Sequence, residues 1–163
     1  MSRTEEELRH AADRSLLRDL LGRYAWEIDH GSPEGWASTF APDGVFEVPD
    51  VGMWVEGTET LEAFARDLQT MLPGVHHVMS GFVFELSGDR ATGRCALNQF
   101  LARPDGVHAI QQGWYEDVYV YGASGWKIQH RRAFTQEPAS TVAGKVGEYT
   151  AAYYAETAKY IRS

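Results

Sequence analysis

The feature that most constrains this chain is a run of long, apolar-patterned segments in its second half, separated by short turns. Four segments have the composition and alternation of strands, at residues 76–86, 91–103, 107–121 and 126–135. The turns between them are rich in glycine and aspartate: Ser87-Gly88-Asp89, Pro104-Asp105-Gly106 and residues 122–125. Because connections this short join antiparallel neighbours, we predict an antiparallel meander.

The first thirty residues have a helical pattern instead. Apolar residues recur at helical intervals from Leu8 to Ile28, which predicts one long helix that ends near residues 29–31. Thr4 and Glu7 have the spacing of a capping box at its start.

Two further helices are predicted before the meander. Ser32-Pro33 has the N-cap and first-residue pattern of a short second helix, which we expect to carry Trp36 and Phe40. Thr58 is placed to cap a third helix with an apolar stripe on one side. The segment between these helices is expected to hold two short strands, 45–48 and 53–55.

The order of helices first and long strands second predicts an α+β fold with the helices on one face of the sheet. A chain of 163 residues is expected to form one domain around a single core. We place that domain at residues 1–138. Residues 139–163 have a helical stripe that includes Tyr149, Tyr153 and Tyr160, and we expect an amphipathic helix that acts as a lid or an oligomer contact.

Charge and composition exclude several classes of partner. The formal net charge is −8 and no basic stripe is present, which disfavours nucleic acid and anionic membrane surfaces. Cys95 is the only cysteine, so an internal disulfide is impossible, and we expect a cytoplasmic protein. The start of the chain is too acidic for a signal peptide, and no apolar run has transmembrane length.

Motifs for bound groups are missing. His76 and His77 are adjacent, so they should point to opposite sides of a strand, and no helical HxxxH spacing occurs. The chain has no glycine-rich phosphate loop and no G-x-S-x-G nucleophile motif. We therefore expect no metal and no cofactor.

Several motifs together resemble the SnoaL-like family. They are the stretch Tyr24–Phe46 with Ile28-Asp29, Trp36, Phe40, Pro42-Asp43 and Val45-Phe46, then Val75-His76-His77, residues 113–119 (GWYEDVY) and Gly125-Trp126-Lys127-Ile128. The resemblance covers residues 8–136. It implies a cone-shaped barrel made of a curved, mixed, mainly antiparallel sheet, with a mostly apolar pocket inside. Members include polyketide cyclases, scytalone dehydratase, bile-acid dehydratases and relatives of ketosteroid isomerase.

The resemblance also suggests catalytic residues. Tyr24, Asp29 and His77 match a Tyr, an Asp and a His of the bile-acid dehydratases, and the Asp and His match the dyad of scytalone dehydratase. A second acid of the former enzymes falls on Gln99, and a second His of the latter falls near Leu101. The partner acid is therefore missing here.

These matches give His77 the role of general acid and base, with Asp29 orienting its ring. The alternative is a hydrogen-bonded pocket-wall histidine and a helix-end aspartate. Tyr24 is either an oxyanion stabiliser or a core residue. Gln99 should point inward with Leu101 and bind a polar substrate group, unless the strand register slips by one residue.

Other residues are candidates for lining the pocket. Tyr115, Trp54 and Leu101 are expected to bind substrate. His130 shares a face with Trp126 and Ile128 if the strand alternates, and would then line the pocket too; otherwise it is a surface histidine paired with a carboxylate. Asp117 is expected to form a structural ion pair with Arg131 or Arg132.

Three functional hypotheses follow from the sequence. The first is a cofactor-independent lyase, cyclase or isomerase acting on a hydrophobic polyketide-, steroid- or terpenoid-like molecule. The second is a non-catalytic binding module for an apolar metabolite, and the third is an oligomerisation domain. In each case we expect a homodimer or homotrimer, because the family leaves one apolar sheet face uncovered by its own helices.

Overall fold

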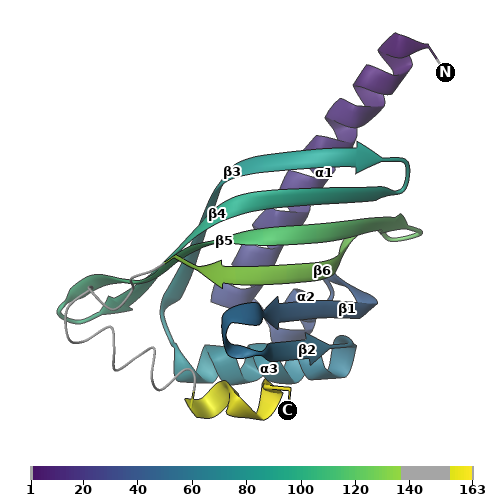
Figure 1. Ribbon diagram of the computed structural model, residues 1–163. Helices are drawn as coiled ribbons and strands as arrows, with labels where there is room; N and C mark the ends of the chain where they lie inside the picture. The colour runs from purple at the N-terminus through teal and green to yellow at the C-terminus, as the bar shows by residue number, and fades with distance from the viewer. Residues whose placement is uncertain (1, 137–154, 163) are drawn as a thin grey trace.

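The computed structural model describes residues 2–136 and 155–162. The elements follow the predicted order of helices and then long strands (Figure 1). The helices are α1 (Arg3–His30), α2 (Pro33–Ala37) and α3 (Thr58–Met71), with short 3-10 turns η1 (Pro49–Val51) and η3 (Ala158–Tyr160). The strands are β1 (Phe40–Val48), β2 (Met53–Glu56), β3 (Val75–Ser87), β4 (Arg90–Arg103), β5 (Gly106–Gly122) and β6 (Gly125–Thr135).

The strands form one curved six-stranded sheet in the order β2-β1-β6-β5-β4-β3. Strands β3 to β6 are an antiparallel meander, as predicted, and β1 joins its edge by pairing parallel to β6. The α+β prediction and the mixed, mainly antiparallel sheet are confirmed. The sheet curves strongly but its two edge strands do not pair, so the cone is open rather than closed.

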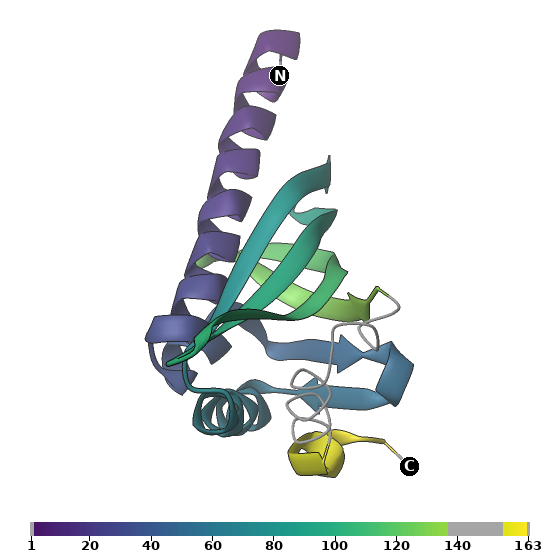
Figure 2. The ribbon, with the colours of Figure 1, turned by 90° about the vertical axis from the view of Figure 1, so that its left-hand side faces the viewer.

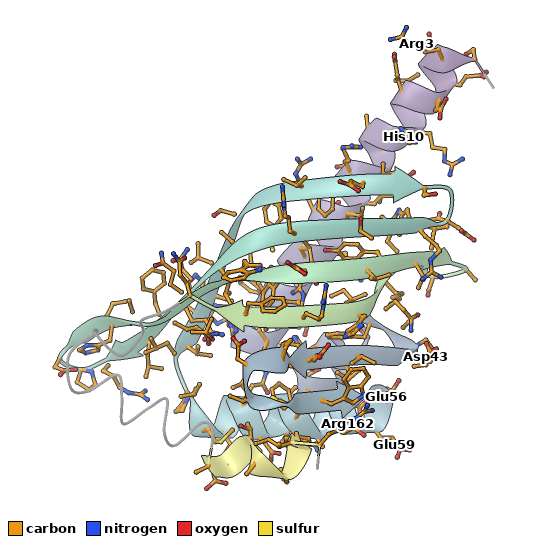
Figure 3. The ribbon with its side chains drawn as sticks, viewed as in Figure 1. Arg3, His10, Asp43, Glu56, Glu59 and Arg162 are labelled. Carbon is orange, nitrogen blue, oxygen red and sulfur yellow. The ribbon has the colours of Figure 1, made fainter. Side chains whose placement is uncertain are left out.

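Helix α1 lies across the concave face of the sheet, and its first turns extend beyond the strands (Figure 2). Arg3 and His10 lie on this projecting part (Figure 3). Leu8 at the start of the predicted stripe is consequently 67% exposed, whereas Leu17 to Ile28 form the buried side of the helix. Asp13 anchors the middle of α1 by accepting a hydrogen bond from the Trp126 indole on β6 at 3.0 Å.

Two predicted helix caps are wrong by one or two residues. Helix α1 is capped by Ser2, whose hydroxyl accepts from the Glu5 N–H while the Glu5 side chain accepts from the Ser2 N–H. This is the capping box expected of Thr4 and Glu7, placed two residues earlier. Helix α3 begins after Gly57, whose φ of 81° suits glycine, and Thr58 is its first residue. The N-cap predicted at Ser32 is confirmed.

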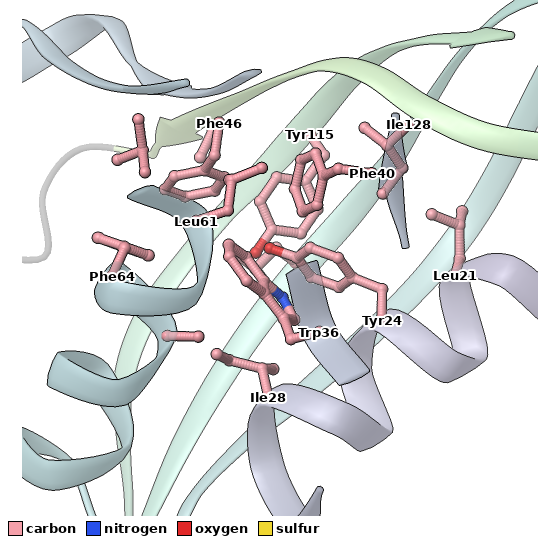
Figure 4. Close-up of a cluster of buried hydrophobic side chains, with 14 of the residues drawn as sticks. Leu21, Tyr24, Ile28, Trp36, Phe40, Phe46, Leu61, Phe64, Tyr115 and Ile128 are labelled. Atoms are coloured by element: carbon pink, nitrogen blue, oxygen red, sulfur yellow. The ribbon is translucent and has the colours of Figure 1, made fainter. Parts of the chain in front are cut away.

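An aromatic cluster fills the space between the helices and the sheet (Figure 4). Trp36 on α2 lies 4.9 Å from Phe40 and 5.9 Å from Phe64, measured between ring centroids. Phe40 was predicted on the second helix, but it is the first residue of β1, because α2 ends after Ala37. The cluster fixes the C-terminal half of α1 against the sheet, which positions the site described below.

Most of the predicted C-terminal helix, including Tyr149 and Tyr153, lies outside the described residues. The part that is described packs on α3 and β2. The Tyr160 hydroxyl donates to Asp67 at 2.6 Å and its ring lies 5.3 Å from that of Phe64. Arg162 donates to Glu56 at 3.0 Å, and the two side chains are adjacent in Figure 3. Among the described helices, none has the length and apolarity needed to cross a membrane.

Candidate functional site

The site is centred on two buried side chains, Asp29 and His77. His77 Nδ1 lies 2.5 Å from Asp29 Oδ1, and the backbone N–H of His77 donates to Asp29 Oδ2 at 2.7 Å. The side chains are 2% and 3% exposed. Asp29 therefore holds the imidazole through its ring nitrogen and holds the strand through the main chain.

The local fold explains this pairing. Asp29 is in the last turn of α1, and His77 is the third residue of β3. Helix α1 runs toward the start of β3 (Figure 2), so residues separated by 48 positions meet there. The structure brings together the two side chains that the family resemblance selected.

Gln99 completes a chain of three side chains. It lies directly opposite His77 on β4, and its side-chain nitrogen is 2.6 Å from His77 Nε2. With Nδ1–H donated to the carboxylate, Nε2 carries the lone pair and accepts from the Gln99 amide. Gln99 points inward as predicted, but its amide contacts the histidine.

A small cavity adjoins Gln99. It has a volume of about 20 Å³ and is lined by Phe46, Val48, Leu97, Gln99, Gln111, Tyr115 and Ala133. This volume is enough for about one water molecule. The walls are apolar except for two amides and one phenol, so a ligand here would find few but directional polar partners.

Behind the cavity lies a buried charged cluster. Arg131 on β6 is 0% exposed and donates from Nε and Nη2 to the two oxygens of Asp117, at 2.8 and 2.7 Å. Its guanidinium lies between the rings of Tyr24 and Tyr115, 4.1 and 4.0 Å from their centroids. The predicted ion pair of Asp117 is thus made with Arg131. Arg132 pairs with Glu116 on the other side of the sheet.

Burial raises the pKa of the tyrosine hydroxyls around Arg131, so they are protonated at neutral pH. Desolvation raises the pKa of Tyr24, and it raises the pKa of Tyr115 and Tyr119 well above the ordinary value. Burial likewise raises the pKa of the Cys95 thiol to about 11, so this cysteine is an unreactive core residue at neutral pH. Tyr24 packs against Trp36, Phe40 and Tyr115 rather than against the dyad.

His130 and Trp54 lie on the outer face of the sheet, so the expectation that they line the pocket is corrected. Strand β6 has one extra residue, Gln129, because Val118 pairs with His130 while Tyr119 pairs with Ile128. This bulge ends the alternation begun by Trp126 and Ile128. His130 then points outward, 2.7 Å from the Glu47 carboxylate and 5.3 Å from the Trp54 ring.

Leu101 is fully buried opposite Val75, beyond Gln99 on β4. It is a core residue and is not among the residues that line the described cavity. A second hollow, of about 280 Å³, lies on the outer face among side chains of β3 to β6. Half of its lining residues are charged, among them Arg94, Glu116 and Arg132.

Sequence reasoning missed several residues of this region. His76 Nδ1 lies 3.2 Å from Asp29 Oδ2, and the ring of His30 lies 5.8 Å from that of His76. Gln111, opposite Gln99 on β5, also lines the cavity. The sequence offered one signal: His30 directly follows Asp29, and His76 directly precedes His77. If Asp29 and His77 form a dyad, their neighbours in the chain must lie at the same helix–strand junction.

Known structures with this fold are numerous, and their names assign few functions. A variant of a Mycobacterium tuberculosis protein of unknown function is 24% identical, with a TM-score of 0.83 over 98% of this chain and 95% of that one. An NTF2-like protein with a cystatin-like fold from Novosphingobium aromaticivorans is 20% identical, with a TM-score of 0.76 over 85% and 92%. A candidate scytalone dehydratase from the same organism is 18% identical, with a TM-score of 0.68 over 78% and 86%. Among curated proteins, none matches significantly.

These similarities establish an NTF2-like, cystatin-like fold. The family model for the SnoaL-like domain matches residues 9–132, from the first turns of α1 to Arg132 on β6. That span includes Asp29, His77 and Gln99. The chain therefore belongs to the family of SnoaL-like domains, which includes small-molecule enzymes such as dehydratases and cyclases.

Proposed function

We propose that this protein is a cofactor-independent lyase, cyclase or isomerase that uses general acid–base chemistry. Its substrate would be a hydrophobic polyketide-, steroid- or terpenoid-like small molecule. The observation that carries this proposal is the buried chain Asp29–His77–Gln99, in which a carboxylate binds one ring nitrogen and the other nitrogen contacts the amide of Gln99, a residue that lines the cavity.

His77 would transfer the proton at Nε2. Asp29 would keep Nδ1 protonated and stabilise the imidazolium that forms when Nε2 accepts a proton. The substrate's proton-bearing group would take the position now held by the Gln99 amide. Gln99 would then turn to hydrogen-bond a substrate carbonyl or hydroxyl. The same proton transfer serves dehydration, double-bond migration and ring closure.

Tyr115 is a third polar group at the cavity, beside the amides of Gln99 and Gln111. Its raised pKa keeps the hydroxyl able to donate a hydrogen bond, and the Arg131 guanidinium beneath its ring fixes its position. Tyr24 would support Tyr115 from the helix side, 6.0 Å away between ring centroids. A substrate larger than the 20 Å³ cavity requires the surrounding side chains to move.

The direct test is a screen of apolar cyclic compounds for both binding and conversion. Ligands would first be identified by thermal stabilisation of the wild-type protein. Each would then be incubated with wild type and with His77→Ala, and products would be followed by mass and optical rotation. Conversion by wild type alone supports the proposal. Tight binding without conversion supports the second hypothesis, a non-catalytic binding module. The presence of Gln99 where related enzymes have an acid favours that hypothesis.

We expect Asp29, and not Gln99, to set the tautomer of His77. Long-range ¹H–¹⁵N spectra should show His77 with a proton on Nδ1 in wild type and in Gln99→Leu. Replacing Gln99 removes a hydrogen bond to Nε2 worth about 0.5–1.5 kcal/mol but leaves the carboxylate in place. Asp29→Asn should lose the preference, since its amide can either donate or accept. An unchanged spectrum in Asp29→Asn would contradict the assignment.

We also expect a homodimer or homotrimer, formed through the outer face of the sheet. Trp114 on this face is 38% exposed and stacks on Phe134 at 5.2 Å. Light scattering should give an oligomer mass at micromolar concentration. Trp114→Glu should weaken association by tenfold or more, as for an interface aromatic worth about 2 kcal/mol. Trp26→Glu, a control on α1 where the residue is 64% exposed, should not. A monomeric wild type would refute this expectation.

A further inference from the structure

Three side chains that no sequence motif connects meet where α1 ends and β3 begins. They are Asp29, His30 and His76, and one ligand atom of each lies within 4.8 Å of the others. Asp29 and His30 are in the last turn of α1, while His76 is the second residue of β3. The same helix–strand junction that forms the dyad with His77 therefore places two other imidazoles beside the same carboxylate.

The donor set has a definite chemical preference. Two imidazoles and one carboxylate suit zinc, cobalt, nickel and copper ions rather than magnesium or calcium, which prefer oxygen ligands. Zinc–ligand bonds of about 2.0–2.2 Å put tetrahedral ligand atoms about 3.4 Å apart. His76 Nδ1 and Asp29 Oδ2 are already 3.2 Å apart, so only His30 must approach.

One ligand is held in place and the other two can adjust. The Asp29 side chain is 2% exposed, and the backbone N–H and ring of His77 bind its oxygens, as outer-shell groups do in metal sites. The His76 side chain is 58% exposed, so it can rotate without disturbing the core. His30 is exposed too, and the ring that it packs against at 4.9 Å, Trp26, is itself 64% exposed, so both rings can move.

Electrostatics at this position favour a cation. The C-terminal end of a helix carries a partial negative charge, and Asp29 adds a full one. Within the part of the chain that the structure describes, no lysine or arginine forms an ion pair with Asp29. Its contacts are to histidines, which are the side chains that transition metals bind.

We propose that Asp29, His30 and His76 form a solvent-accessible site for one divalent transition-metal ion of the zinc class. Asp29 supplies Oδ2, the two histidines supply one nitrogen each, and water fills the remaining positions. The site shares Asp29 with the dyad but uses the opposite oxygen from the one that binds His77 Nδ1. If the proposed function also holds, the bound ion draws charge from Asp29 and slows turnover.

The test measures metal binding without any substrate, so its outcome is independent of the proposed function. Tag-free protein is titrated with Zn²⁺ by calorimetry and with Co²⁺ by visible absorption. We expect one ion per chain. His30→Ala and His76→Ala should each weaken binding by at least about tenfold, the lower bound for losing even an outer-shell partner.

Two controls separate this site from others. His108→Ala removes a histidine that pairs with Asp105, distant in sequence from the three ligands, and should leave the affinity unchanged. His77→Ala should keep the stoichiometry of one, because His77 supports the carboxylate without binding the ion. The inference is overturned if wild type binds no ion at millimolar metal, or if the His30→Ala/His76→Ala variant binds as tightly as wild type.

Discussion

Replacing His77 with alanine should reduce turnover of an identified substrate by about 10²–10⁴-fold, the usual contribution of a positioned general acid or base. Asp29→Asn should be nearly as harmful, because the neutral amide neither fixes the tautomer nor compensates an imidazolium. The double variant should be little worse than either single one, since residues that act as a unit are not additive. Steady-state kinetics on the three variants measure this.

A histidine–carboxylate pair on the opposite face supplies the matched control. His130 contacts Glu47 at 2.7 Å, outside the cavity. His130→Ala and Glu47→Gln should leave turnover within about twofold of wild type. His77→Gln should accompany His77→Ala, because its amide can still donate to Asp29 and preserves folding, while it cannot act as a general acid or base at neutral pH. Full activity in either His77 variant would remove the catalytic role and leave a binding site.

Replacing Arg131 with methionine should lower the free energy of unfolding by about 3–5 kcal/mol, because it leaves the Asp117 carboxylate buried without its partner. Both side chains are 0% exposed, and Tyr119 is the other hydrogen-bond donor to Asp117. Adding Asp117→Asn to Arg131→Met should recover part of the loss, since the uncompensated charge is gone. Urea unfolding followed by fluorescence gives the three free energies.

The neighbouring residue provides the comparison. Arg132 forms an ion pair of the same length, 2.7 Å, with Glu116, but the two side chains are 46% and 41% exposed. Arg132→Met should therefore cost no more than about 1 kcal/mol. If Arg131→Met is as mild as Arg132→Met, water reaches the interior cluster and Arg131 does not hold Tyr24 and Tyr115 in place.

Much of the fold could be predicted because its signals are local. Glycine-rich turns delimit the four long strands within one or two residues. The apolar periodicity of the first helix stops at Ile28, and α1 itself ends two residues later at His30. Errors arose where a local rule allowed two solutions. Ser2 and Thr4 both precede a glutamate by three residues, so spacing alone cannot show which of the two forms the capping box.

The site was predicted less completely, since it depends on contacts between distant segments. The resemblance selected Asp29, His77 and Gln99, and the structure brings all three together. No periodicity could show that Gln99 would bind the histidine, or that His30 and His76 would share Asp29. Arg131 was expected in a structural ion pair. Its burial between two tyrosine rings was not expected, because regular alternation along β6 places His130, and not Arg131, on the inner face.

The extra residue at position 129 has a consequence for how such chains diverge. Deleting Gln129 would leave Ile128 and Arg131 inside and His130 outside, because the shortened strand then alternates regularly through this point. What would change is the bend that the bulge adds. A relative that is one residue shorter here would thus keep the same interior and have a flatter sheet. Sequence alignments across this strand need a gap at Gln129, or every downstream residue is compared with one from the opposite face.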